Sequence, residues 1–448
     1  MAAAPVRFLL RSMRRPVLWL DGPWRSILVA AIVGAMGAFA VDGFRVVLFA
    51  FESIFVGAQG GYLVAAARQL PPEVRLLAPA IGGLAAGLLL WLAERRRRPE
   101  LRSHRGDYIE AVAIGQGRLD LRGGLLKVLA SLLVVSTGGA VGREGAMVLL
   151  AAMLASAAGR LFGRTVELRL VVSCGAAAGM AAAYHAPLAG SMFVAEILLG
   201  SLALAQLGPV IVAAVVSHGV TTWLVGRSML FVLPPLLAPT AQQLLPMVVV
   251  GFVAAAAGAA LLVWLDLARA FYTRRQWPLP LAFASGGLVV GALSLWRPEV
   301  WGNGYSSILQ LLTVAPVWQT IALVLALKLV AIAATTGSGA PGGVFTPTLF
   351  VGAAFGALAA AAAQALGAPP ALAPVYVLVG MATLLAATTH APVMAALMVF
   401  EMTGQYALLA TVLPACVVAA LLARRLHPRS VYGLGEVAVS EPANQQQR

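Results

Sequence analysis

Charged residues and cysteines are scarce in this sequence. Asp, Glu, Lys and Arg make up 11% of its 448 residues, whereas soluble domains carry about 25%. The two cysteines, Cys174 and Cys416, lie in apolar stretches, so we expect neither a disulfide framework nor a cysteine-based metal site. Hydrophobic residues account for 60% of the chain, and the mean hydropathy is +0.90. This composition excludes an ordinary soluble domain and gives no reason to expect a cofactor or a metal.

Acidic residues are the scarcer charge, with 17 Asp and Glu against 31 Lys and Arg and a net charge of +14. The basic residues stand at the ends of apolar stretches and do not form one interleaved face, so we expect no nucleic-acid partner. They lie in the segment 94–105 and at Arg7, Arg11, Arg14, Arg15, Arg25, Arg424, Arg425 and Arg429. The positive-inside rule then places both termini and the 94–105 segment in the cytoplasm and predicts an even number of crossings.

Apolar stretches recur from one end of the chain to the other. A bilayer core of about 30 Å requires roughly 20 apolar residues per helix, so the pattern predicts an all-α, multi-pass membrane protein with lipid around it. Several stretches are too long for one crossing or are broken by Gly and Pro, so we expect more helices than stretches. The stretches lie near 27–50, 76–93, 124–158, 170–199, 204–225, 244–265, 281–296, 319–336, 345–367, 373–400 and 407–424.

Two later segments repeat two earlier ones. STGGAVGREGAM at 136–147 aligns with TGSGAPGGVFTP at 336–347 by a shift of 200. The segments 174–196 and 379–401 align by a shift of 205, and in both a His-Ala-Pro triplet is followed nine residues after the Pro by a glutamate, Glu196 or Glu401. We interpret this as an internal duplication, and duplicated halves of membrane proteins commonly lie inverted, with a substrate site between them.

The duplication divides the chain into five parts. We expect a basic cytoplasmic segment, a first membrane repeat, a linker, a second membrane repeat and a cytoplasmic tail, at 1–26, 27–225, 226–243, 244–432 and 433–448.

The Gly-rich breaks at 137–146 and 337–347 predict helix starts near Gly142–Ala146 and Phe345–Pro347. A helix start carries unpaired N–H groups and a partial positive charge, which suits a small anion. Glu144 would compete with that anion for the same donors until it is protonated, so it is a candidate gate sensitive to pH and voltage. The alternative is a salt bridge of Glu144 with Arg143 or Lys127 that serves packing alone.

These motifs resemble those of the CLC family of chloride channels and proton/chloride antiporters, and within it most closely the bacterial B-type subfamily of voltage-gated chloride channels. The resemblance covers essentially the whole chain. GREGA at 142–146 matches the family's Gly-Arg-Glu-Gly-Pro motif with Ala146 in place of Pro, and GVFTP at 343–347 matches its second motif intact. AAAYHAPLAG, LLAATTHAPV, WGNGYSSI and the HPRSVYGL segment with Tyr432 also have counterparts.

The resemblance implies an inverted-repeat fold of about eighteen helices and a homodimer with one anion pathway in each subunit. It implies that Glu144 is the gate and that the Tyr432 hydroxyl closes the inner side of the chloride site. Chloride would bind the backbone amides of Arg143, Glu144, Gly145, Val344 and Phe345.

The sequence departs from the family pattern at two places. SHRGD at 103–107 replaces a Gly-Ser-Gly-Ile-Pro motif, so Ser103 or His104 is the candidate for an inner anion site. Ile197 stands where coupled antiporters generally have a proton-relay glutamate, which leaves neighbouring Glu196 as the candidate for a proton path.

Three functions follow, in order of preference. The first is a passive chloride channel gated by voltage or pH, acting as an electrical shunt, and the second is a proton-coupled chloride antiporter. The third is a membrane-embedded enzyme that uses His185, His390, Glu196 and Glu401, which no close ligand spacing supports. We therefore expect no enzymatic activity.

Overall fold

The computed structural model shows an all-helical chain. It describes residues 22–58, 63–95, 108–113, 116–162, 166–226, 229–236, 240–314 and 316–433. Seventeen α-helices lie within these ranges, close to the number that the family resemblance implies, and they include no strand. The all-α fold class is therefore confirmed.

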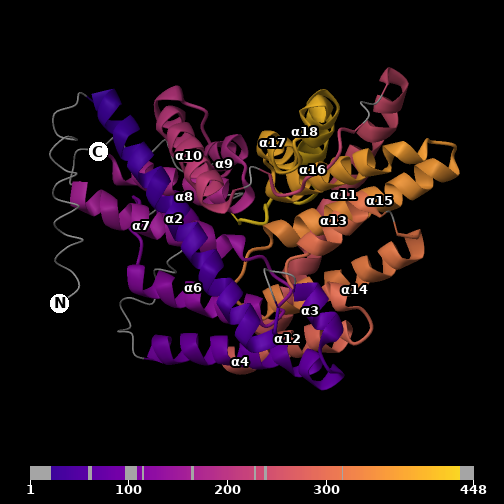
Figure 1. Cartoon of the computed structure of the whole chain (residues 1–448), viewed down its shortest axis with the longest axis horizontal. Helices are drawn as coiled ribbons and strands as arrows, with labels where there is room; N and C mark the ends of the chain where they lie inside the picture. The colour runs from indigo at the N-terminus through magenta and orange to yellow at the C-terminus, as the bar shows by residue number, and fades with distance from the viewer. Residues whose placement is uncertain are drawn as a thin grey trace, which may run out of the picture.

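The helices fall into two sets that occupy the two sides of the molecule, indigo to magenta and pink to yellow in Figure 1. The first set is α2 (Gly22–Val56), α3 (Leu63–Gln69), α4 (Pro72–Arg95), α5 (Tyr108–Ala113), α6 (Leu121–Ser136), α7 (Glu144–Phe162), α8 (Leu168–Tyr184), α9 (Pro187–Phe193) with the π-helical turn η3 (Val194–Leu199), and α10 (Leu204–Val225). The second set is α11 (Ala241–Arg275), α12 (Leu279–Ser294), α13 (Tyr305–Thr313), α14 (Trp318–Gly337), α15 (Phe345–Ala365), α16 (Ala373–Thr389), α17 (Pro392–Thr403) and α18 (Leu409–Leu426), with 3₁₀ turns at η4 (Pro298–Val300), η5 (Pro370–Leu372) and η6 (Tyr406–Leu408).

The packing repeats between the two sets. The helix α8 packs on α7, α2 and α10, and its counterpart α16 packs on α15, α11 and α18. Both α8 and α16 end on a histidine in the left-handed conformation, His185 at φ 55° and His390 at φ 59°. Each histidine is followed by Ala-Pro, and the Pro starts the next helix, α9 or α17. The aligned His-Ala-Pro triplets therefore form the same turn twice.

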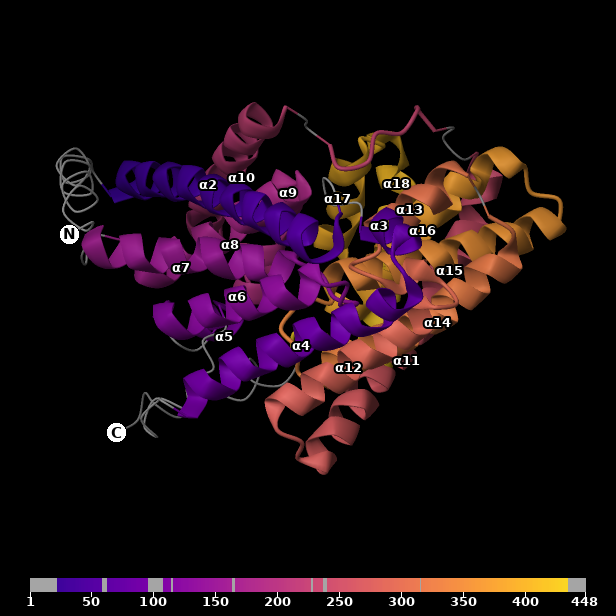
Figure 2. The same cartoon turned by 60° about the horizontal axis from the view of Figure 1, so that its bottom comes forward.

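The two halves are joined by close helix crossings. At the crossing of α4 and α12, which lie side by side in Figures 1 and 2, a Cβ on Gly287 would meet the Pro79 carbonyl, and a Cβ on Gly83 would meet that of Phe283. Small residues allow this approach, which favours helix association in lipid. The helices α9 and α17 also pack on each other.

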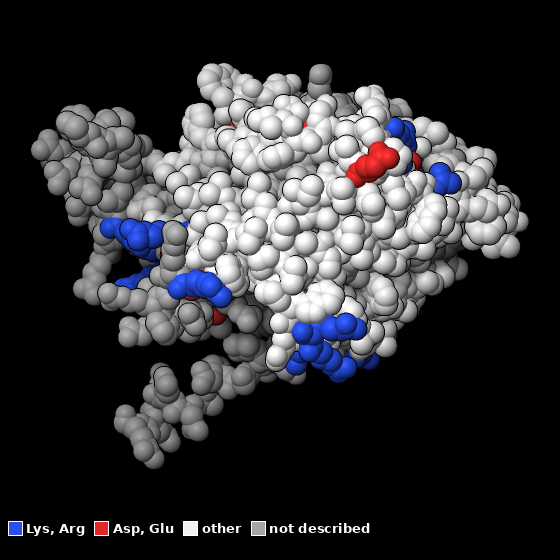
Figure 3. Space-filling view, turned by 90° about the horizontal axis from the view of Figure 1, so that it is seen from below, with Lys and Arg blue, Asp and Glu red and all other residues white. Residues whose placement is uncertain are grey.

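Eight of the described helices are long and apolar enough to cross a membrane. Large apolar side chains are exposed on several of them, among them Val46 at 70% and Trp223 at 79%. Figure 3 shows a broad uncharged surface with Lys and Arg in separate groups near its margin. An apolar surface of this extent suits a multi-pass membrane protein.

Candidate functional site

Two Gly-rich loops from opposite halves meet at the centre of the molecule. The Gly142 amide donates to the Gly343 carbonyl at 2.6 Å, and the Gly343 amide donates to the Gly142 carbonyl at 2.7 Å. A Cβ on Gly142 would lie 3.0 Å from the Gly343 oxygen, so glycine permits this approach. Because α7 begins at Glu144 and α15 at Phe345, both predicted helix starts are confirmed and lie beside each other.

The first-turn amides of these two helices lack acceptors. The first helical bonds run from Met147 to Arg143 and from Thr348 to Val344, which leaves the amides of residues 144–146 and of Phe345 and Thr346 without an intrahelical partner. No side chain in the part of the chain that the structure describes accepts from these amides, and the nearby Glu144 carboxylate bonds to the Asn303 side chain instead. Pro347 has no N–H to satisfy. The two starts therefore present free donors to each other.

Two neighbouring helix starts are capped instead. The Glu196 carboxylate accepts from the Val393 and Met394 amides of α17 at 3.3 and 2.8 Å. The Glu401 carboxylate accepts from the Leu188 and Ala189 amides of α9 at 3.0 and 2.7 Å. A carboxylate at a helix start satisfies the free amides and complements the dipole. Each half thus caps a helix of the other, and Glu196, the candidate for a proton path, is held in such a cap.

Glu144 lies at the meeting point and is 3% exposed. Its Oε1 accepts a hydrogen bond of 3.0 Å from the Asn303 side-chain amide, and its Oε2 has no hydrogen-bond partner. The guanidinium of Arg143 instead lies 5.7 Å from the Phe49 ring centroid and 5.6 Å from that of Tyr305. Among the described residues, the salt bridge between Glu144 and Arg143 that would serve packing alone is therefore not formed.

A cavity of about 370 Å³ opens beside the two helix starts. Gly145 and Ala146 line it from one loop, and residues 339–344 line it from the other. Lys127 and Arg269 also line it, and the described residues around it include no acidic side chain. Its walls therefore combine backbone donors with positive charge, which favours an anion.

Tyr432 lies on the wall of the same cavity. Its ring packs edge-on against Phe193, with centroids 5.7 Å apart. The segment that carries it is tied to α16 by a bond of 2.9 Å from the Val431 amide to the Thr388 carbonyl. Contacts with Phe193 and with α16 thus hold Tyr432 at the cavity that both Gly-rich loops line.

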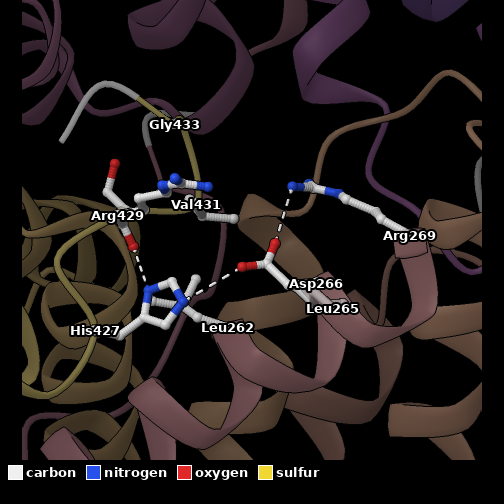
Figure 4. A pocket seen from close by; sticks show the side chains of 9 residues that line it. Leu262, Leu265, Asp266, Arg269, His427, Arg429, Val431 and Gly433 are labelled. Atoms are coloured by element: carbon white, nitrogen blue, oxygen red, sulfur yellow. Dashed lines mark hydrogen bonds and ion pairs between the residues drawn. The ribbon is translucent and has the colours of Figure 1, made fainter. Parts of the chain in front are cut away.

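A second cavity, of about 330 Å³, lies between α11 and the segment after α18. Figure 4 shows the His427 ring between two acceptors, the Arg429 carbonyl at 2.7 Å and the Asp266 carboxylate at 3.3 Å. Both acceptors need a donor, so the ring meets both of them only when both of its nitrogens carry hydrogen. Asp266 also lies 3.7 Å from Arg269, which borders both cavities. His427 therefore fastens the Tyr432 segment to α11.

The structure does not place the following residues at the cavity. Ser103 and His104 fall outside the described residues, so the inner anion site stays a prediction. Lys328 is fully buried, and Ile197 packs against the apolar core beside Glu196. No three His, Cys, Asp or Glu side chains come together as metal ligands within the described ranges.

Sequence reasoning missed Asn303 as a partner of Glu144. The Gly-Asn-Gly triplet at 302–304 is an evident turn signal. Its contact with a residue of the other half depends on how the halves pack, which no local pattern reveals.

Comparisons with known proteins agree with this geometry. The sequence profile of the family described as voltage gated chloride channel matches residues 86–424. The chain is 46% identical over 417 residues to the voltage-gated ClC-type chloride channel ClcB of Escherichia coli O9:H4 (strain HS), with 91% of this chain and 98% of that protein covered. An equal identity, over 415 residues, relates it to ClcB of Escherichia coli O81 (strain ED1a).

Solved structures share the fold. A slow cyanobacterial Cl⁻/H⁺ antiporter matches at a TM-score of 0.79 and 24% identity, over 92% of this chain and 97% of that one. A CLC-type fluoride/proton antiporter matches at a TM-score of 0.73 and 23% identity, also over 92% of this chain and 97% of that one. These relatives are named as channels and transporters, and none of them is named as an enzyme. The motifs, the paired helix starts and these likenesses agree, and the chain belongs to the CLC family.

Proposed function

We propose that this protein carries chloride across the bacterial inner membrane and that Glu144 gates the passage. The observation that carries the proposal is the contrast among four helix starts. Those of α9 and α17 are capped by Glu401 and Glu196. Those of α7 and α15 have no side-chain acceptor among the described residues and lie beside each other. A membrane interior offers no partner for free amides, so a mobile anion is the natural acceptor at the two uncapped starts.

The proposed chloride site uses backbone donors. The amides of Arg143, Glu144, Gly145, Val344 and Phe345 are its members, and the Tyr432 hydroxyl is the donor on the side of the cavity. Helix starts and preorganised amides stabilise an anion without a fixed positive charge at contact distance. Such a site binds weakly enough for the ion to leave, which conduction requires.

Glu144 supplies the gate in this account. Its carboxylate occupies the space in front of the α7 and α15 starts, where its charge competes with chloride. Protonation removes that charge, so acid is expected to open the pathway. Because the carboxylate moves through the field of the membrane, voltage acts on the same step.

Passive conduction is the preferred mode. Ile197 cannot carry a proton, and the Glu196 carboxylate beside it is already bound to two amides of α17. Both features argue against a continuous proton path and favour a channel that acts as an electrical shunt. The transport requires no cofactor or metal, since chloride is the substrate.

A proton-coupled antiporter is the second candidate. The fold is shared with two antiporters that carry chloride or fluoride against protons. Glu144 is itself a proton acceptor beside residues that line the cavity, so the rest of a proton path would have to come from water or from Glu196.

The proposed setting is a homodimer with one pathway in each subunit and both termini in the cytoplasm. The basic segments at the chain ends and at 94–105 support this orientation. Cross-linking in membranes and protease accessibility from each side test the dimer and the orientation.

The mode is tested with the purified protein in liposomes under a chloride gradient and no proton gradient. A channel dissipates the gradient without moving protons uphill. Sustained uphill proton movement in a fixed ratio to chloride would contradict the channel and support the antiporter. The absence of any anion flux would contradict both functions.

A further inference from the structure

Lys328 is a fully buried basic residue that contacts no acid among the residues that the structure describes. Its Nζ donates to three successive backbone carbonyls, those of Val300, Trp301 and Gly302, at 2.8, 3.2 and 2.7 Å. An ammonium group has three donors, so the three carbonyls saturate it. The lysine therefore serves the turn 300–304 and does not face the anion cavity.

The turn is fixed from other sides as well. The Gly302 amide donates to the Gly138 carbonyl at 3.2 Å, and the buried Trp301 ring packs directly on Gly138. Gly302 and Gly304 adopt φ of +63° and +99°, a left-handed backbone that favours glycine. Lys328 and the first Gly-rich loop thus hold the turn from opposite ends.

Asn303 is the residue that this turn presents. Its Oδ1 accepts from the Tyr305 amide at 3.3 Å, which fixes the orientation of the side chain and aims Nδ2 at Glu144. The resulting bond of 3.0 Å runs from Nδ2 to Oε1, and Oε2 has no hydrogen-bond partner within the described structure.

We propose that Asn303 is a positioning residue for the gate. Its amide holds the ionised Glu144 carboxylate in front of the two helix starts, and Lys328 acts through the turn to place that amide. The proposal rests on Glu144 being the gate. An amide donor stabilises a carboxylate but cannot protonate it, so Asn303 sets the acidity at which Glu144 is released.

Other charged and titratable groups surround Glu144. Arg143 is adjacent in the chain, Tyr305 comes from α13, and Tyr184 comes from the end of α8. Glu52 of α2 is buried and lies within electrostatic range of Arg143. Replacing Asn303 alters none of these side chains, although the Tyr305 amide loses its bond to Oδ1. A variant that keeps an amide therefore has to accompany the one that removes it.

The experiment measures chloride flux in liposomes against external pH for the full chain. Asn303→Ala removes the donor at 3.0 Å from the Glu144 carboxylate, so protonation becomes easier and the half-maximal pH rises by about 1 unit. Asn303→Asp places a second acid beside Glu144 and raises the half-maximal pH by at least as much. Asn303→Gln keeps an amide and returns the profile toward that of the unaltered protein. Gln310→Ala, which removes an exposed amide on α13, leaves the profile unchanged.

Lys328→Met tests the indirect part of the inference. Lys328→Met shifts the half-maximal pH in the same direction as Asn303→Ala. The variant that combines Lys328→Met with Asn303→Ala shifts it no further, because both changes act on the bond between Asn303 and Glu144. If Lys328→Met does not fold, Lys328→Arg, which keeps the charge but not the compact ammonium, replaces it in this comparison. Additive shifts would overturn the role assigned to Lys328.

Glu144→Gln, measured in the same series, separates the two proposals. A pH-independent flux in Glu144→Gln, together with an unaltered profile in Asn303→Ala, leaves the gate standing and overturns the role of Asn303. A Glu144→Gln variant that keeps the original pH dependence overturns the gate itself. The inference predicts that Asn303→Ala has no effect on the pH profile in the Glu144→Gln background.

Discussion

Glu196 and Glu401 cap each other's helices. Glu196, just after α9, accepts the first amides of α17, and Glu401, near the end of α17, accepts the first amides of α9. Each glutamate thus binds amides of the other half of the chain, about 200 residues away in the sequence. It also explains why both aligned segments carry a glutamate nine residues after Pro.

The reciprocal caps predict equal losses of stability from either side. Glu196→Gln and Glu401→Gln each leave at least one buried amide without an acceptor, which costs about 1–3 kcal/mol. Thermal unfolding in detergent measures the loss. The exposed Glu110→Gln serves as the control, and a loss in only one of the two cap variants would contradict the reciprocal arrangement.

The gate is tested directly by Glu144→Gln and Glu144→Ala. Neither side chain carries a negative charge, so anion flux stays high and loses its pH dependence. Flux measured from pH 4 to pH 8 gives the profile. If both variants titrate like the unaltered protein, the gate lies elsewhere.

The close approach of the two Gly-rich loops predicts a large effect from one methyl group. Gly142→Ala introduces a Cβ that meets both the Glu144 carboxylate and the Gly343 carbonyl, so the loops must separate and chloride binding weakens by at least about tenfold. Chloride titration calorimetry measures the change. Gly219→Ala is the matched control because its Cβ would meet no atom within 4 Å, and equal affinities in the two variants would count against the site.

Tyr432 is expected to contribute both a hydroxyl and a ring. Tyr432→Phe keeps the packing against Phe193 and loses one donor, so chloride affinity falls by no more than about tenfold. Tyr432→Ala also opens the cavity wall and weakens binding further. Affinity that is the same in all three proteins would remove Tyr432 from the site.

His427 is expected to act on the same binding step from outside the cavity. His427→Ala removes the contact with Asp266 that holds the segment before Tyr432, so chloride affinity falls, as it does in Tyr432→Ala. Loss of the half-exposed ion pair lowers the free energy of unfolding by less than about 1 kcal/mol. Calorimetry and thermal unfolding separate the two effects. An unchanged affinity would show that the contacts of Val431 and Tyr432 position the ring alone.

Local sequence signals predicted the helix starts well. Gly-rich breaks followed by Glu144 and by Phe345–Pro347 place the beginnings of α7 and α15, because glycine breaks and first-turn proline act over a few residues. The all-α fold follows from apolar length, and the repeat follows from the aligned His-Ala-Pro turns. Each of these signals is contained in a short segment.

Contacts between the halves escaped prediction. The Asn303–Glu144 bond and the crossed caps of Glu196 and Glu401 join residues that are far apart in the chain, and their existence depends on the packing of two inverted units. Lys328 illustrates the same limit. The position of this lysine in an apolar helix does not reveal its role, whereas its three carbonyl partners show that it holds a turn.

The central claim is that an anion rests on the free amides where α7 and α15 begin. Anomalous diffraction from crystals soaked in bromide measures this directly, with Glu144→Ala used to empty the space that the carboxylate fills. The account predicts a bromide peak within hydrogen-bond distance of the Gly145 and Phe345 amides. Bromide peaks confined to other places, with these amides facing only protein or lipid, would contradict it.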